Sequence, residues 1–171
     1  MEIIVKKFEE LTLNELYEIL RVRSDVFVVE QNCVYQDVDN VDQDAYHVYM
    51  KENGKIVAYL RVVDKDKRLD EVSLGRVISL KRRCGLGTAL MKAGIAVAEE
   101  KFHAQKIKIG AQLYAKPFYE QVGFKQISGE YLEDGIPHIY MIYEKMFSNN
   151  MKSIQENILI KRYRKLLIFQ K

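Results

Sequence analysis

A glycine turn between a strand-like and a helix-like segment constrains this chain more than any other feature of its sequence. Gly85-Leu86-Gly87 follows the strand-like residues 71–80 and begins a segment with apolar residues at helical spacing. Glycine lets the backbone approach a ligand closely, and a helix start offers free N–H groups with a partial positive charge. We therefore expect a cradle for a pyrophosphate group, to which Arg82 and Arg83 can add charge-assisted hydrogen bonds. The alternative is an ordinary strand-to-helix turn that contains two glycines.

The residues beside the turn exclude two common classes of phosphate-binding loop. A P-loop needs Lys and then Ser or Thr after its last glycine, whereas Thr88 and Ala89 follow Gly87 here. A dinucleotide-binding turn needs a third glycine at the position of Leu90. The pattern that remains is R-x-x-G-x-G directly after a strand.

Turn and capping signals divide the rest of the chain into short elements. The pattern T-x-x-E at Thr12 is a capping box that begins a helix ending near Ser24, and a further helix is expected from Pro117 to Gly123. Residues 25–44 are polar and irregular, which predicts a long surface loop that can include a short helical turn. Asn-Gly at residues 53–54 is a hairpin signal. The expected strands are residues 2–8, 45–50, 55–63, 71–80, 106–111, 124–131 and 139–145.

The order of these elements predicts an α/β (α+β) fold. It has a mixed, mostly antiparallel central sheet, with a helix-crossed parallel pair in the middle and helices on its flanks. The 171 residues suit one domain, and no apolar run approaches the roughly 20 residues that span a bilayer. The N-terminus does not resemble a signal peptide, and two cysteines are too few for a disulfide framework. We therefore expect a cytoplasmic protein with no membrane span.

The charge of the chain is divided unevenly along its length. Residues 1–146 hold 21 Lys/Arg and 23 Asp/Glu, whereas residues 147–171 hold six Lys/Arg and one Asp/Glu. Apolar residues in this basic extension approximate a helical stripe, which predicts a helix that packs on the domain or on a second subunit. A basic amphipathic helix can also contact a membrane or nucleic acid. We expect no nucleic-acid partner, and a homodimer is compatible with the pattern.

Three further segments carry a resemblance to a known family. Residues 118–124 (FYEQVGF) follow the F/Y-Y-x-x-x-G-F pattern of GNAT acetyltransferases, in which R-x-x-G-x-G is the pyrophosphate loop. Residues 22–39 and 131–141 are similar to the early and late signatures of the ElaA-like branch of that superfamily. The resemblance covers residues 1–146 and implies the GNAT acyl-CoA N-acyltransferase fold.

The resemblance implies transfer of acetyl from acetyl-CoA to an amine by direct attack in a ternary complex, without a metal. Tyr119 is the expected acid for the leaving thiolate, because a phenol is protonated at neutral pH. Glu30 is the expected base, with His47 as the alternative. Which of Arg82 and Arg83 takes the family's arginine position is left open. The expected acetyl-CoA contacts are Val77, Ser79, Arg82, Arg83, Cys84, Gly85, Leu86, Gly87 and Thr88.

The segment from Ser24 to Met50 contains six carboxylates and no Lys or Arg. If it lines the acceptor site, it would attract a cationic amine, such as a small molecule or a protein amine. The alternative is a solvated acidic loop. His138 and Cys33 are expected to be structural, and the alternative for His138, near the end of a strand, is a place facing the acceptor site. A different class of function is a CoA-binding module without catalysis that acts through a partner, and acyl-homoserine-lactone synthases are a further alternative among enzymes.

Overall fold

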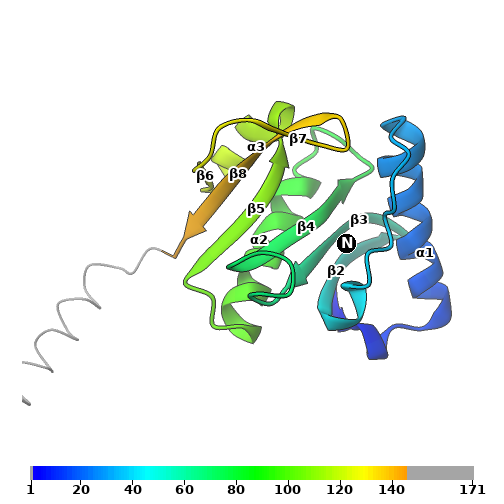
Figure 1. The fold of residues 1–171 in the computed structure, drawn as a ribbon. Coiled ribbons are helices and arrows are strands. Elements are labelled where there is room, and N and C mark those ends of the chain that lie inside the picture. Colours follow the sequence, from blue (N-terminus) through cyan, green and yellow to red (C-terminus); the bar gives the residue numbers. More distant parts are fainter. Residues whose placement is uncertain (1, 146–171) are drawn as a thin grey trace, which may run out of the picture.

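The computed structural model describes residues 2–145, which form one sheet with helices on both of its faces (Figure 1). The strand order is β1-β2-β3-β4-β5-β8-β6, with β7 paired to β8. Neighbouring strands are antiparallel except β4 and β5, which run parallel, so the predicted sheet with a parallel pair at its middle is confirmed. The strands are β1 (Glu2–Lys7), β2 (Ala45–Glu52), β3 (Lys55–Val63), β4 (Val72–Ser79), β5 (Lys106–Gln112), β6 (Lys125–Gln126), β7 (Tyr131–Glu133) and β8 (Ile136–Glu144).

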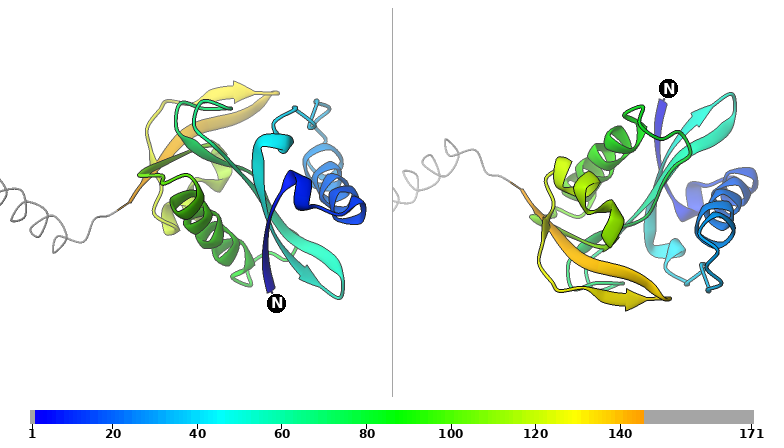
Figure 2. Two further views of the ribbon diagram at one scale, coloured as in Figure 1. Left: turned by 90° about the horizontal axis from the view of Figure 1, so that it is seen from below. Right: turned by 90° about the horizontal axis from the view of Figure 1, so that it is seen from above.

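The helices cover the sheet from two sides. Helices α2 (Leu86–Lys101) and α3 (Lys116–Gln121) lie on one face, and α1 (Leu13–Arg23) lies on the other (Figure 2). The larger core lies under α2, where Leu90 and Met91 are fully buried, and each such side chain contributes about 2–3 kcal/mol of transfer free energy. A smaller core under α1 includes Ile19. Strand β3 lies between both cores, which explains its nearly continuous apolar sequence.

The first helix continues beyond its predicted end. The capping box at Thr12 is confirmed, since the hydroxyl accepts a hydrogen bond from the backbone N–H of Glu15 at 3.2 Å. Residues Ser24–Glu30 then form a π-helix, so the helical turn that the predicted loop allowed for lies at its start and the irregular loop begins only after Glu30. The backbone N–H of Gln31 donates to the carbonyl of Val26 at 3.2 Å, and this i→i+5 bond adds one residue to the turn.

The strand predicted at residues 124–131 is wrong. Only Lys125–Gln126 pairs with β8 as β6, and the chain then leaves the sheet where Ser128 accepts a hydrogen bond from the backbone N–H of Tyr140 at 2.8 Å. Strand β7 and the early start of β8 form an additional hairpin around Asp134-Gly135, two residues in the left-handed region. The predicted helix in the basic extension, residues 147–171, lies outside the described residues.

Strand β4 is bulged where it leaves its neighbour β5. Two of its residues, Arg76 and Val77, oppose the single residue Leu60 of β3, and Arg76 has a φ of 53°. The pairing of β4 with β5 covers only Val72 and Ser73. From there to the end of β4, no strand within the described part of the chain pairs with its main chain on the β5 side. The bulge and the short pairing open a cavity between the two central strands.

Candidate functional site

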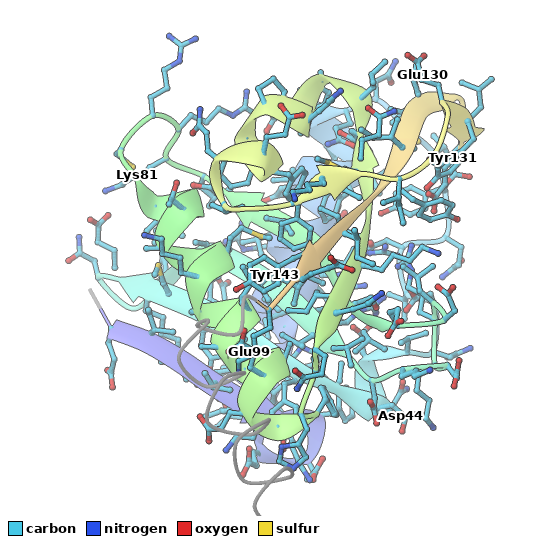
Figure 3. The ribbon with its side chains drawn as sticks, turned by 90° about the vertical axis from the view of Figure 1, so that its left-hand side faces the viewer. Asp44, Lys81, Glu99, Glu130, Tyr131 and Tyr143 are labelled. Carbon is cyan, nitrogen blue, oxygen red and sulfur yellow. The ribbon has the colours of Figure 1, made fainter. Side chains whose placement is uncertain are left out.

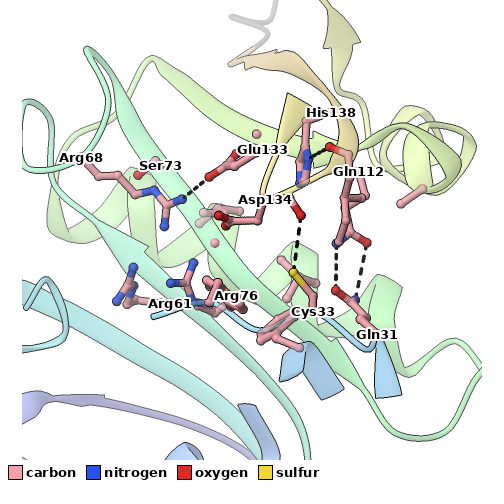
Figure 4. Close-up of a pocket in the computed structure, with 18 of the residues that line it drawn as sticks. Gln31, Cys33, Arg61, Arg68, Ser73, Arg76, Gln112, Glu133, Asp134 and His138 are labelled. Carbon is pink, nitrogen blue, oxygen red and sulfur yellow. Dashed lines mark hydrogen bonds and ion pairs between the residues drawn. The ribbon is translucent and has the colours of Figure 1, made fainter. Parts of the chain in front are cut away.

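The cavity lies between β4 and β5 and is closed by three other parts of the chain (Figure 4). Gly75 and Gly110 leave space on the two strands. A Cβ at Gly110 would lie 3.0 Å from the Tyr131 hydroxyl of β7, a tight contact that a side chain at this position would have to displace. The π-helix, the segment from Tyr114 to α3 and the β7–β8 hairpin complete the walls. Side chains that line the cavity include Phe27, Gln31, Arg61, Arg68, Arg76, Val77, Gln112, Tyr119, Glu133, Asp134 and His138.

Tyr119 is one of the predicted site residues that the structure places on this cavity. Its ring packs edge-on against Phe118 and Phe124, with centroid distances of 5.1 and 6.2 Å. Burial raises the pKa of Tyr119 above the usual value for a phenol, so the hydroxyl keeps its proton at neutral pH. Among residues 2–145 the hydroxyl has no hydrogen-bond partner. It is therefore available to a bound molecule.

The glycine turn forms an exposed loop at the start of α2. Gly85 is in the left-handed region with φ of 79°, and no atom lies within 4 Å of the place where its Cβ would be. The side chains of Ser79 and Cys84 both donate to the carbonyl of Lys81, at 2.9 and 3.2 Å, and so shape the turn. Figure 3 shows Lys81 in this loop ahead of α2. The N–H groups of the first helical turn have no intrahelical acceptor and face no capping side chain.

The structure does not place Glu30 or His47 on the cavity. Glu30 is exposed at the end of the π-helix, where it forms an ion pair with Arg82 of the glycine turn. His47 is fully buried and bonds to the Tyr59 hydroxyl at 2.9 Å and the Asp42 carbonyl at 3.0 Å. Burial lowers the pKa of His47, so its position is that of a neutral structural histidine.

His138 lines the cavity, although the sequence predicted a structural role. Its Nδ1 lies 2.8 Å from the carbonyl of Ile136, and since a carbonyl only accepts, Nδ1 carries the proton. In the neutral form of the ring, the lone pair is therefore on Nε2. His138 therefore offers a proton acceptor within the cavity. The early start of β8, which the sequence did not indicate, is what brings it there.

Comparisons with known proteins assign the domain. A model of the acetyltransferase (GNAT) domain matches residues 15–145. The chain belongs to the GNAT acetyltransferase family. It is 39% identical to protein ElaA of Escherichia coli over 139 residues, which are 79% of this chain and 91% of ElaA. It is 40% identical to a UPF0039 protein of Schizosaccharomyces pombe over 148 residues, which are 84% of this chain and 97% of that protein.

Solved structures support the same assignment. The crystal structure of E. coli ElaA matches with a TM-score of 0.78 at 37% identity, over 84% of this chain and 99% of that one. A crystal structure titled as an acyl-CoA N-acyltransferase from Pseudomonas aeruginosa matches with a TM-score of 0.78 at 38% identity, with the same coverage. The predicted GNAT acyl-CoA N-acyltransferase fold and the ElaA-like resemblance are thus confirmed. An acyl-CoA N-acyltransferase type of activity fits this fold.

The acidic segment of this GNAT domain is only partly solvated, since Asp25, Glu30 and Asp44 are exposed whereas the other three carboxylates are paired with arginines. Three buried or nearly buried arginines, Arg23, Arg61 and Arg76, neutralise three of its six carboxylates. We call these three arginines, together with Asp37, Asp39 and Asp42, the Arg–Asp cluster. The closest contacts are Arg23–Asp42 at 2.7 Å, Arg61–Asp39 at 2.6 Å and Arg76–Asp37 at 2.6 Å.

The cluster holds the loop after the π-helix against the sheet. Burial raises the pKa of Asp39, but the hydrogen bonds and charge of Arg61 outweigh it, so the pKa lies below its usual value. The cluster was not predicted from the sequence. A signal was present, because Arg61 stands between Leu60 and Val62 in an apolar strand, and a buried arginine needs carboxylate partners. Both predicted roles of the acidic segment are therefore wrong for Asp37, Asp39 and Asp42.

Among residues 2–145, no group of three or more His, Cys, Asp or Glu side chains is arranged to hold a metal ion. No helix in the same range is long and apolar enough to cross a membrane.

Proposed function

We propose that this GNAT domain transfers the acetyl group of acetyl-CoA to a primary amine by direct attack in a ternary complex. The observation that carries the proposal is the Tyr119 hydroxyl. It is protonated, has no partner among the described residues and faces a cavity between β4 and β5. One edge of that cavity is main chain of β4 without a strand partner in the described part of the chain.

The residues of the glycine turn fit a pyrophosphate. Gly85 presents open backbone, and the first N–H groups of α2 are free to donate. Residues Arg82 to Thr88 would hold the diphosphate of CoA, with Arg83 or Arg82 supplying the guanidinium. Val77 and Ser79 would contact the pantetheine arm along β4. When bound, acetyl-CoA supplies a thioester whose C–S bond breaks as the amine nitrogen forms the new C–N bond.

The cavity side chains can manage the two protons of this reaction. Tyr119 would donate its proton to the leaving thiolate. The main-chain N–H groups of β4 near Val77 would donate to the thioester oxygen, where negative charge develops. The sequence predicted Glu30 as the base, and that remains a prediction. His138 is better supported, because its free Nε2 lies on the cavity whereas Glu30 is paired with Arg82 outside it.

The test is titration of the purified full chain with acetyl-CoA, followed by a thiol-release assay with a panel of amines. We expect binding, and release of free CoA that depends on the amine. Failure to bind acetyl-CoA would refute the assignment of the glycine turn. Binding without turnover on any amine would contradict the enzyme and favour a CoA-binding module.

A further inference from the structure

We infer that the amine acceptor carries a carboxylate close to its amino group, as in an amino acid, and that Arg68 binds this carboxylate. The inference rests on the proposed acetyl transfer and names its substrate class. It replaces the expectation of an acceptor selected by its positive charge alone, which depended on carboxylates that the Arg–Asp cluster neutralises.

Arg68 is the cavity arginine whose ion pairing is incomplete. Its side chain is 30% exposed, and its nearest carboxylate oxygens are on Glu133 at 3.4 Å and Asp39 at 3.6 Å (Figure 4). Charge-assisted hydrogen bonds between these groups are normally about 2.7–2.9 Å long. Burial and the charges of Arg76 and Arg61 lower the pKa of Arg68, so its charge is poorly compensated where it stands.

Neither neighbour competes strongly with a bound carboxylate. Asp39 already accepts two short bonds from Arg61, at 2.6 and 2.7 Å, and so cannot turn to Arg68. Glu133 belongs to the β7–β8 hairpin and its side chain is 42% exposed, which leaves it free to swing into solvent. A planar carboxylate can therefore take both N–H groups of the guanidinium fork.

The Ser73 hydroxyl is a second polar group on the face of β4 that Arg68 covers. The Ser73 side chain lines the cavity, the residue is 2% exposed, and its hydroxyl has no hydrogen-bond partner among residues 2–145. A buried hydroxyl without a partner is costly, and an acceptor oxygen would relieve that cost. Ser73 and Gly75 share one face of the strand, and the Arg68 Nη1 atom lies 4.0 Å from the place where a Gly75 Cβ would be. The guanidinium thus lies over the face that also carries the hydroxyl.

The spacing along β4 limits the length of the acceptor. Gly75, under the guanidinium, and Val77, at the proposed thioester position, are two residues apart, and because the strand is bulged between them their separation is at most the roughly 7 Å of an extended chain. A guanidinium–carboxylate contact of about 3 Å occupies nearly half of that distance. The remainder admits an acceptor in which about one to three carbon atoms separate the amine from the carboxylate. Long polyamines do not provide this pair of groups.

The kinetic test compares acceptors that differ in one group. A panel of α-amino acids and β-alanine, each with its carboxamide, is assayed beside putrescine and O-phosphoethanolamine. We expect the acids to exceed their amides in kcat/KM by about tenfold or more, mainly through KM. Equal kcat/KM values for the amides and the acids would overturn the inference. A higher kcat/KM for O-phosphoethanolamine would show that the site prefers a phosphate to a carboxylate, which would also overturn it.

Variants then assign the effect to Arg68. We expect Arg68→Ala to lower kcat/KM for acids by about tenfold or more and to leave the amides within about twofold, with partial rescue in Arg68→Lys. Lys67→Ala is the matched control, because it removes a neighbouring cation that pairs with Asp44 on the surface. Equal losses for acids and amides in Arg68→Ala, or an acid-specific loss in Lys67→Ala, would contradict the assignment.

A binding measurement separates this inference from the proposed reaction. Calorimetry of the CoA-saturated protein with an N-acetyl amino acid and with its amide needs no turnover. We expect the acid to bind about tenfold more tightly, and this preference to vanish in Arg68→Ala. Equal binding refutes the carboxylate site even if acetyl transfer is found. If the acid still binds more tightly than its amide but no amine is acetylated, the proposed function is refuted and the carboxylate site is not.

Discussion

Gly87 lies against the ring of Phe118, so that a Cβ at Gly87 would come within 3.3 Å of the ring. This contact joins the glycine turn to α3, the helix that carries Tyr119. From the sequence, the only reason for a glycine at position 87 was the close approach of the backbone to a phosphate. The structure adds packing between two parts of the proposed site.

The first prediction tests this packing. Gly87→Ala should lower the free energy of unfolding by about 1 kcal/mol, because crowding against Phe118 outweighs the gain in helix propensity. In a Phe118→Ala background the same change should become stabilising by a similar amount. Urea unfolding of the two single variants and the double variant measures the coupling. An equal effect of Gly87→Ala in both backgrounds would show that the contact carries no energy.

The second prediction concerns the acid. Tyr119→Phe should retain acetyl-CoA affinity and lower kcat by about a hundredfold, because only the proton donor is lost. Steady-state kinetics and calorimetry measure the two quantities. Tyr114→Phe is the control, since this tyrosine also lines the cavity but is 77% exposed. Unchanged turnover in Tyr119→Phe would remove Tyr119 as the acid.

The third prediction separates the two candidate bases. His138→Gln should lower kcat by at least about tenfold at neutral pH, because it removes the free imidazole nitrogen. Glu30→Gln should retain kcat and bind acetyl-CoA up to about fivefold more tightly, since Arg82 is released from an exposed ion pair. Kinetics and calorimetry on both variants decide. The reverse pattern, with kcat lost in Glu30→Gln, would support the base predicted from sequence.

The fourth prediction concerns the Arg–Asp cluster. Asp39→Asn should lower the free energy of unfolding by about 2–3 kcal/mol at pH 7, because Arg61 loses its bidentate partner in a mostly buried place. The pKa of Asp39 is depressed in the folded state, so its contribution is complete above the unfolded pKa of about 4. It is lost as the pH falls below that value.

The pH dependence supplies the control for this variant. The difference between the wild type and Asp39→Asn should shrink in urea unfolding as the pH is lowered from 5 to about 2. Asp44→Asn removes an exposed carboxylate that pairs with Lys67, and it should change stability by less than about 1 kcal/mol. A constant difference for Asp39→Asn across this pH range would contradict the proposed ion pair.

Much of the fold was predicted because its signals are local. The capping box at Thr12 and the hairpin at Asn53-Gly54 act between residues one to four positions apart, and both appear where expected. The error in the strand predicted at residues 124–131 also has a local cause, because Ser128 and Gly129 end the strand after β6. The short hairpin of β7 and β8 has few residues over which alternation could be seen.

The sequence by itself determined the order of the elements, the glycine turn and the position of Tyr119 after Pro117, since these depend on neighbouring residues. Only the tertiary structure decided which charges meet. Arg23 and Asp42 are 19 residues apart, and Arg76 and Asp37 are 39 apart. Their contacts depend on strand register and on the bulge at Arg76, which no local pattern encodes. The same register places Arg68 above Gly75 and Glu30 beside Arg82, and so decides which side chains face the cavity.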